Sequence, residues 1–221
     1  MDKSKYFQIC ETLLGCRAIG IEVVIITPIK SVFQRFEKNL NCATVNDKGF
    51  FNNVIFETAN KRKGMLIRVP EGIAAQDVMY AFSNIDIFFF GYAGGLLEKE
   101  MFGTVVEVST AIDVDGVMYP LKCSGLYKSA VCGYSPCLLG QLAQQYSRKM
   151  RRRKCEVVDM EVVYCTREAL QNSNHITAYL LITDVPGKIN FWELENEEKS
   201  FLKVMRDDAI CKISNYINLY S

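Results

Sequence analysis

Acidic residues stand among apolar neighbours at two places in the sequence. Asp159 and Glu161 bracket Met160 between apolar neighbours, and Asp184 follows an apolar run that begins at Ile176. A carboxyl group in an apolar, closed pocket keeps its proton more readily and can donate it to a leaving group. The two positions therefore indicate acid–base chemistry, and the alternative is that each acid only caps a helix or a turn.

A glycine-rich stretch follows the most apolar run of the chain. The run Ile85–Phe90 suits a strand that is buried on both faces of a sheet, and Gly91, Gly94 and Gly95 come next. We expect the strand to end where the glycines begin. Glycine leaves no side chain in the way of a ligand, and open α/β sheets bind ligands at the carboxyl ends of their strands. The pattern predicts a ligand-binding loop over residues 91–95.

The rest of the chain alternates between strand and helix patterns, which predicts an α/β fold. Strands are expected at 19–27, 50–58, 65–69, 103–112, 117–121 and 176–182, and helices at 31–36, 73–82, 136–150 and 195–219. Ser135 would cap the third helix, and a further helix would start near Asp159. The stretch 122–135 has little regular pattern and is expected to be a loop.

These elements predict a single-domain, three-layer α/β fold with a central mixed, mostly parallel twisted sheet flanked by helices. Residues 19–221 would form this domain, and residues 1–18 an N-terminal helical extension. A short amphipathic helix in the extension would place on one side Tyr6, Phe7, Cys10, Leu13 and Leu14.

The composition is that of a globular protein with one large core. Hydrophobic residues make up 49% of the 221 residues, and the formal net charge of +1 steers the chain toward neither nucleic acid nor an acidic membrane. The nine cysteines form no CxxC pair, which favours reduced thiols and a cytoplasmic location. With His175 as the single histidine, no zinc site is expected. Neither a targeting segment nor a membrane span is expected.

A basic run covers Arg148–Lys154, with six positive charges in seven residues. Such a run is compatible with nucleic-acid or phosphate binding. It is equally typical of a solvated helix C-terminus, where the helix dipole favours cations. Aromatic residues do not interleave it, as a single-strand binding surface would need, so the solvated helix end is preferred and no nucleic-acid partner is expected.

Three motifs in this order resemble the nucleoside phosphorylase and nucleosidase superfamily. They are Gly91–Leu96, then Val158–Glu161, and then Thr183–Asp184 at the end of a strand. The superfamily includes purine nucleoside phosphorylase, methylthioadenosine/S-adenosylhomocysteine nucleosidase and futalosine hydrolase. The resemblance extends over about residues 19–219.

The resemblance implies a role for each matching residue. Asp184 would be the catalytic acid that protonates a purine ring nitrogen, with Thr183 in support. Glu161 would accept hydrogen bonds from the sugar hydroxyls, and Met160 would pack against the ribose. The substrate-binding residues would be Gly91, Tyr92, Ala93, Gly94, Asp159, Met160, Glu161 and Thr183.

Two departures from the superfamily pattern bear on the nucleophile. Nucleosidases usually follow the first strand with an acid that activates water, but residues 27–31 contain no carboxylate; a replacement base is expected around Ser31 or Tyr92. Phosphorylases usually place an arginine and often a serine where this chain has Phe89 and Tyr92. Cations that could replace those phosphate contacts are Lys30, Arg35 and Arg68.

The favoured function is hydrolysis of the N-glycosidic bond of a purine-type nucleoside, because the phosphate-binding residues of the superfamily are missing. The alternatives are an atypical nucleoside phosphorylase, with phosphate as co-substrate, and a non-catalytic relative that binds a nucleoside. No cofactor is expected. The partners would be a small-molecule nucleoside and further copies of the chain, because members of the superfamily usually form homo-oligomers; a dimer is favoured.

Overall fold

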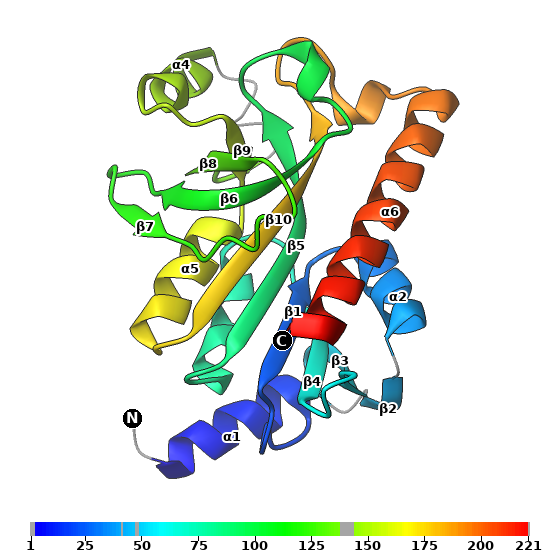
Figure 1. Cartoon of the computed structure of the whole chain (residues 1–221). Helices are drawn as coiled ribbons and strands as arrows, with labels where there is room; N and C mark the ends of the chain where they lie inside the picture. The colour runs from blue at the N-terminus through cyan, green and yellow to red at the C-terminus, as the bar shows by residue number, and fades with distance from the viewer. Residues whose placement is uncertain (1–2, 41, 47–48, 138–143, 221) are drawn as a thin grey trace.

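The computed structural model describes residues 3–40, 42–46, 49–137 and 144–220 (Figure 1). Its strands are β1 (Val23–Thr27), β2 (Cys42–Asn46), β3 (Asn52–Glu57), β4 (Lys63–Arg68), β5 (Asp86–Gly95), β6 (Val105–Ile112), β7 (Met118–Pro120), β8 (Ser129–Tyr134), β9 (Val157–Asp159) and β10 (His175–Asp184). Its α-helices are α1 (Lys3–Leu14), α2 (Lys30–Asn39), α4 (Gln144–Arg152), α5 (Val162–Gln171) and α6 (Asn196–Tyr220). Short 3₁₀ helices are η1 (Ile73–Ala81), η2 (Lys99–Met101) and η3 (Phe191–Glu193).

All the strands belong to one mixed sheet, as predicted. Its order is β10-β6-β8-β9-β5-β1-β4-β3-β2, with β7 beside β6. Because β10 also pairs with β5, the strands β5, β9, β8, β6 and β10 close into a ring. Parallel pairs do not predominate, contrary to the sequence prediction: among the described strands, parallel and antiparallel pairings are equally frequent.

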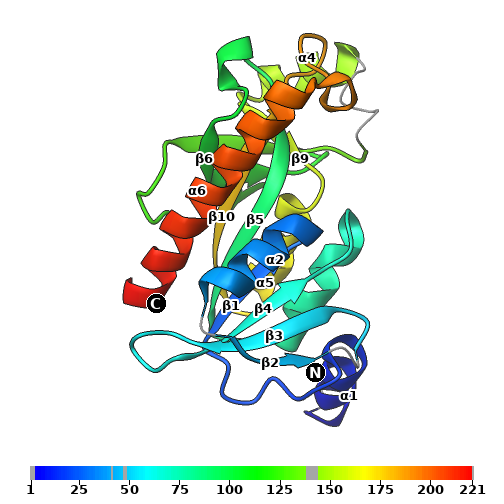
Figure 2. The same ribbon diagram turned by 90° about the vertical axis from the view of Figure 1, so that its right-hand side faces the viewer.

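Helices cover both faces of the sheet (Figures 1 and 2). Phe88 and Phe90 of β5 face α2 and α6, while Ile87 and Phe89 face the side covered by α1, η1 and α5. This alternation is the period of two that a strand imposes on its side chains. It explains why the strand is apolar at every position, since β5 lies between two cores.

The predicted glycine loop is wrong, because β5 continues as a strand through Gly95. Its last residues are held on both sides, by β10 in parallel and by β9 in antiparallel pairing. A Cβ atom added at Gly91 would lie 2.7 Å from the ring of Phe89 and 3.3 Å from a methyl group of Leu180. Gly91 therefore serves packing between neighbouring side chains, and no turn is needed there.

Strands β2, β8 and β9 lie where no strand was predicted. Strand β8 occupies part of the stretch expected to be a loop, and it pairs in parallel with β6 and β9. Strand β2 adds to β3 in antiparallel pairing. Strand β8 depends on partners that are distant in the sequence, and β2 is an edge strand of the sheet. A local sequence pattern indicates neither situation.

Most other predicted elements are confirmed with shifted ends. The predicted hairpin is formed by β3 and β4, and β7 is antiparallel to β6. The first strand begins at Val23 instead of Ile19. The helix expected at 73–82 is the 3₁₀ helix η1, which follows Gly72 at φ 78°. Helix α4 forms the end of the predicted helix 136–150, whose residues 138–143 lie outside the described part of the chain.

The terminal helices pack on opposite faces of the sheet. On α6 the buried residues Ile210, Ile213 and Ile217 confirm the predicted apolar stripe, but Phe201 is 46% exposed and stacks on Phe102. On α1, Cys10 and Leu14 are fully buried. The side chains of the predicted Tyr6 and Phe7 lie outside the described part. Among the described residues, no helix is long and apolar enough to cross a membrane.

Candidate active site

The three motifs identified in the sequence meet at Gly94. In the sheet, Gly94 pairs with Asp184 of β10 on one side and with Val158 of β9 on the other. The acids of β9 and β10 are therefore brought to the carboxyl end of β5 from opposite directions. Ligands bind at such strand ends in α/β proteins.

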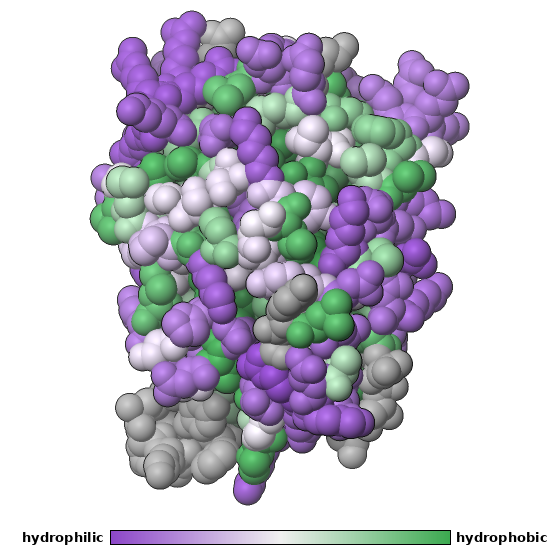
Figure 3. Space-filling view, in the orientation of Figure 1, coloured by the Kyte–Doolittle hydropathy of each residue, from purple (hydrophilic) through white to green (hydrophobic). Residues whose placement is uncertain are grey.

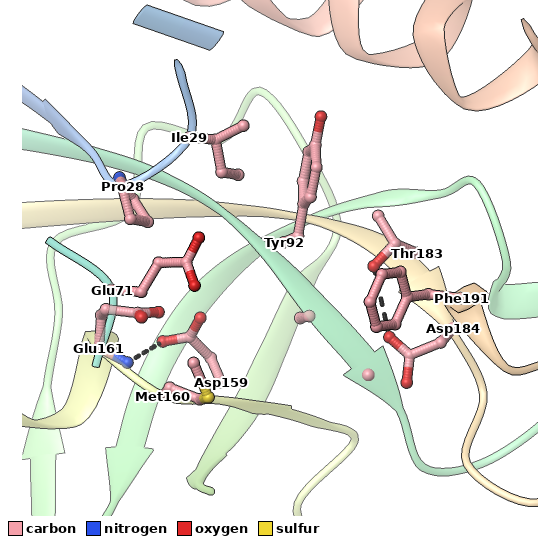
Figure 4. A pocket seen from close by; sticks show the side chains of 12 residues that line it. Pro28, Ile29, Glu71, Tyr92, Asp159, Met160, Glu161, Thr183, Asp184 and Phe191 are labelled. Carbon is pink, nitrogen blue, oxygen red and sulfur yellow. Dashed lines mark hydrogen bonds between the residues drawn. The ribbon is translucent and has the colours of Figure 1, made fainter. Parts of the chain in front are cut away.

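A cavity of about 220 Å³ opens at this junction (Figure 4). It is lined by Pro28, Ile29, Glu71, Tyr92, Ala93, Gly94, Asp159, Met160, Glu161, Thr183, Asp184 and Phe191. All the residues that the sequence assigned to the site are among them except Gly91, which is enclosed in the sheet between Phe89 and Leu180. The lining is apolar apart from its carboxylates and Thr183.

Asp184 lies at an irregularity of β10. The register between β10 and β5 shifts between Ile182 and Asp184, which leaves Thr183 as an extra residue, and such bulges re-aim side chains. Burial raises the pKa of the Asp184 carboxyl to about 6, although the hydrogen bond that Thr183 donates over 3.3 Å acts in the opposite direction. Near neutral pH a useful fraction of Asp184 is protonated, as a general acid requires.

Asp159 holds the start of α5. Its Oδ1 accepts hydrogen bonds from the backbone N–H groups of Glu161 at 2.8 Å and Val162 at 2.5 Å. Burial raises the pKa of this carboxyl, and these backbone bonds lower it. The prediction of a helix that starts beside the two acids is confirmed, and the capping bonds occupy one oxygen of Asp159.

Glu161 is 4% exposed and lines the cavity. It accepts a 2.5 Å hydrogen bond from the backbone N–H of Gly72. Burial raises the pKa of Glu161 to about 9, and the nearby charge of Asp159 acts in the same direction. The buried pair therefore retains a proton at neutral pH. A ligand that donates hydrogen bonds to Glu161 would favour its ionised form.

The ring of Tyr92 lines the cavity on the side opposite Asp159 and Met160. Figure 4 shows its hydroxyl directed away from the carboxylates and toward α6, where Arg206 interacts with it. Ser31 is not among the residues that line the cavity. The expectation of a replacement base around Ser31 or Tyr92 is therefore not met by this geometry, because one residue is absent from the lining and the other points its hydroxyl elsewhere.

The cations proposed for phosphate binding do not reach the cavity. Arg35 faces Asp207 at 3.8 Å on the α2–α6 side. Arg68 lines a separate surface hollow beside Phe50, and Lys30 is an exposed residue at the start of α2. Within the described part of the chain, no Lys or Arg lines the cavity.

The basic run forms the end of α4 and its following turn. Lys149, Arg151 and Arg153 donate hydrogen bonds to the carbonyl oxygens of Val114, Leu96 and Asp113, at 3.3, 2.6 and 2.7 Å. Figure 3 shows hydrophilic residues over this helix. These contacts favour the interpretation of a solvated helix end that also ties α4 to the ends of β5 and β6.

Four lining residues, Pro28, Ile29, Glu71 and Phe191, were not among the predicted site residues, and Glu71 and Phe191 are the two that bear on the chemistry. Glu71 follows β4, which is parallel to β1, so its position after a strand was the same signal that identified Asp184. It was obscured because Pro70 and Gly72 made the segment resemble an ordinary turn. Phe191 is 41% exposed and packs edge-on against Trp192, with ring centroids 5.4 Å apart; no local pattern distinguishes it from a surface aromatic. Among the described residues, no group of His, Cys, Asp or Glu could hold a metal ion.

The fold is that of the enzymes that cleave nucleosides at the N-glycosidic bond. No protein-family profile matches the sequence, and no curated protein matches it. The likeness is found by structure, and it confirms the fold that the three motifs implied.

Three solved structures illustrate the match. The Campylobacter jejuni 5′-methylthioadenosine/S-adenosylhomocysteine nucleosidase superposes with a TM-score of 0.74 at 9% identity, covering 90% of this chain and 99% of that one. A futalosine hydrolase mutant of Helicobacter pylori gives 0.71 at 9% identity, with coverage of 90% and 99%. The AMP nucleosidase of Bacteroides thetaiotaomicron gives 0.70 at 16% identity, with coverage of 97% and 100%.

Proposed function

We propose that this protein hydrolyses the N-glycosidic bond of a purine-type nucleoside. The observation that carries the proposal is Asp184, a carboxyl with a pKa raised to about 6, placed by a strand irregularity in the same cavity as Glu161. An acid that keeps its proton can protonate a ring nitrogen of the base, which makes the base a better leaving group. The similar structures are nucleosidases and a futalosine hydrolase by name, which supports the same reaction class.

The sugar would lie between Met160 and Glu161. The Met160 side chain is half-buried in the lining and offers an adaptable apolar surface. The Glu161 carboxylate would accept hydrogen bonds from the sugar hydroxyls, and charged acceptors make the stronger hydrogen bonds. Ala93 and Gly94 keep the wall beside the sugar free of bulky side chains.

Water fits this cavity better than phosphate as the nucleophile. Four carboxylates line it, namely Glu71, Asp159, Glu161 and Asp184, and no described lining residue is a cation. A phosphate anion would be repelled at the short distances of a poorly solvated pocket, whereas a water molecule pays no such cost. Hydrolysis is therefore proposed over phosphorolysis.

We also propose that the protein acts in the cytoplasm as a homodimer and without a cofactor. Free thiols on the described cysteines, including the exposed Cys123 and Cys211, suit a reducing compartment. The dimer follows from the resemblance to oligomeric nucleosidases. Light scattering coupled to gel filtration measures it directly, and a monomeric mass would contradict it.

Free base is expected to be released from a purine nucleoside at the same rate with and without phosphate, because water is the proposed nucleophile. The measurement is chromatographic detection of the base after incubation with nucleosides, 5′-thio-nucleosides and nucleotides. Release that requires phosphate would identify a phosphorylase. Nucleoside binding without release from any substrate would identify a non-catalytic relative.

Replacing Phe191 with alanine is expected to raise KM about 5- to 100-fold with a smaller effect on kcat, since stacking of a base on an aromatic ring contributes about 1–3 kcal/mol. Phe191 lies beside Asp184 in the lining (Figure 4), where the base would be protonated. Phe50→Ala is the matched control, because Phe50 is an exposed phenylalanine outside the lining. An unchanged KM in the Phe191 variant would place the base elsewhere.

A further inference from the structure

We propose that Glu71 is the general base that activates the attacking water. The inference rests on the proposed hydrolysis and names the residue that supplies the nucleophile. Hydrolysis of a glycosidic bond with inversion needs two carboxyl groups on opposite faces of the sugar, one to protonate the leaving group and one to deprotonate water. The cavity contains four carboxyl groups, so the base can be identified by what the others are engaged in.

Three of the four have another task or are unsuited to the role. Asp184 is the acid on the leaving-group side, next to Thr183 and Phe191. Asp159 is 2% exposed, and its Oδ1 is bound to two backbone N–H groups at the start of α5. Glu161 is 4% exposed and accepts a hydrogen bond from the N–H of Gly72. Burial and the neighbouring charge of Asp159 raise its pKa, which favours the neutral carboxyl, and a neutral carboxyl cannot take up another proton.

Glu71 differs from these in its access to solvent. It is exposed while it also lines the cavity, so a water molecule can reach it and the proton it takes up can return to solvent. Figure 4 shows its carboxylate directed into the cavity from the side of Pro28, with Asp184 on the far side beyond Asp159 and Met160.

The sheet sets this separation. Glu71 follows β4 and Asp184 ends β10, and the strand order from one to the other is β4-β1-β5-β10. Three strand intervals of ~4.8 Å place the two strand ends about 14 Å apart. Side chains that reach inward from both ends shorten this separation, and inverting glycosidases use roughly 6.5–9.5 Å between their carboxyl groups to accommodate a water.

The segment that carries Glu71 is fixed on both sides. Pro70 restricts the backbone before it, and Gly72 after it has φ 78° and ψ −158°, a conformation open to glycine. The N–H of Gly72 is bonded to Glu161. The residue proposed to bind the sugar therefore also positions the segment that holds the proposed base.

In the proposed step, water replaces the base at the anomeric carbon of the sugar. The water oxygen forms a bond to the anomeric carbon as the carbon–nitrogen bond breaks, and that bond's electron pair goes to the base. Glu71 takes one proton from the water, and Asp184 gives its proton to a ring nitrogen of the base. The products are the neutral base and a sugar of inverted configuration, and solvent returns each carboxyl to its starting state.

The test is Glu71→Gln, which keeps the size of the side chain and removes the basic oxygen. We expect kcat/KM to fall about 10²- to 10⁴-fold, while the affinity for a non-cleavable nucleoside analogue changes little. Glu197→Gln, an exposed glutamate on α6, is the matched control and should keep full activity. Glu71→Ala with added azide should recover sugar release as the glycosyl azide of inverted configuration, because a small anion needs no base.

The outcomes separate this inference from the proposed function. Wild-type turnover in Glu71→Gln, or a wild-type product of retained configuration by NMR, would overturn the role of Glu71 and leave nucleoside hydrolysis standing. An inactive wild-type protein would overturn both. If Glu71→Gln fails to fold by circular dichroism, Glu71→Asp replaces it; full activity with a shortened carboxylate and no response of Glu71→Ala to azide would also overturn the proposal.

Discussion

Replacing Asp184 with asparagine is expected to lower turnover by about two to four orders of magnitude, which is the usual contribution of a positioned general acid. Asparagine has the same shape and keeps a partner for Thr183, whose hydroxyl lies 3.3 Å from Oδ1. It lacks only the proton that the leaving base requires. The measurement is single-turnover base release, and an unchanged rate would remove Asp184 from the mechanism.

The same substitution is expected to make the protein more stable at alkaline pH. Burial raises the pKa of Asp184 from 3.8 to about 6, so the folded state binds this proton more tightly than the unfolded state. The favourable contribution of the neutral carboxyl is complete below about pH 4 and is lost as pH rises through about 6. The difference between the two pKa values corresponds to a loss of up to about 3 kcal/mol in the free energy of unfolding at high pH. Asparagine does not ionise and therefore avoids this loss.

Thermal unfolding at two pH values measures this effect. At pH 8 the Asp184→Asn protein should unfold several degrees above the wild type, and near pH 4 the two should converge. Asp115→Asn, at an exposed turn position, is the control and should show no such pH-dependent gain. A variant that is both inactive and less stable at pH 8 would indicate that Asp184 has a structural role.

Replacing Glu161 with glutamine is expected to lower kcat/KM about 10- to 100-fold, because a hydrogen bond to a charged group contributes about 1.5–3 kcal/mol. The fold should tolerate it, since burial and Asp159 raise the pKa of Glu161 to about 9 and glutamine resembles the neutral acid. What is lost is the ionised form that accepts bonds from both sugar hydroxyls.

The diagnostic measurement compares a ribonucleoside with its 2′,3′-dideoxy analogue. The wild type should prefer the ribonucleoside, and the Glu161→Gln protein should lose most of that preference. Glu168→Gln provides the control, because Glu168 is also buried but is bonded to Tyr80 and Arg167 outside the cavity. Equal activity of the wild type on both nucleosides would already contradict a sugar-binding Glu161.

Local sequence determined the parts of the site that depend on where a strand ends. The apolar run before Asp184 is strand β10, as predicted, and the carboxyl ends of neighbouring strands come together at one edge of a sheet. Periodicity likewise located α2, α6 and the β3–β4 hairpin. These features follow from residues a few positions apart, so the sequence carries them directly. The short strand β9 before Asp159 was not predicted as a strand.

Only the tertiary structure decided how the strands pair and therefore what completes the cavity. Gly91 to Gly95 would favour a turn in isolation, but β9 and β10 hold them as a strand on both sides. Strand β8 exists through its pairing with β6 and β9. Glu71 lies far from Asp184 in the sequence, and Phe191 lies only a few residues after it. Both line the cavity with Asp184 although their own segments resemble surface turns. Long-range strand pairing has no local signature, and it is what brings these side chains to one cavity.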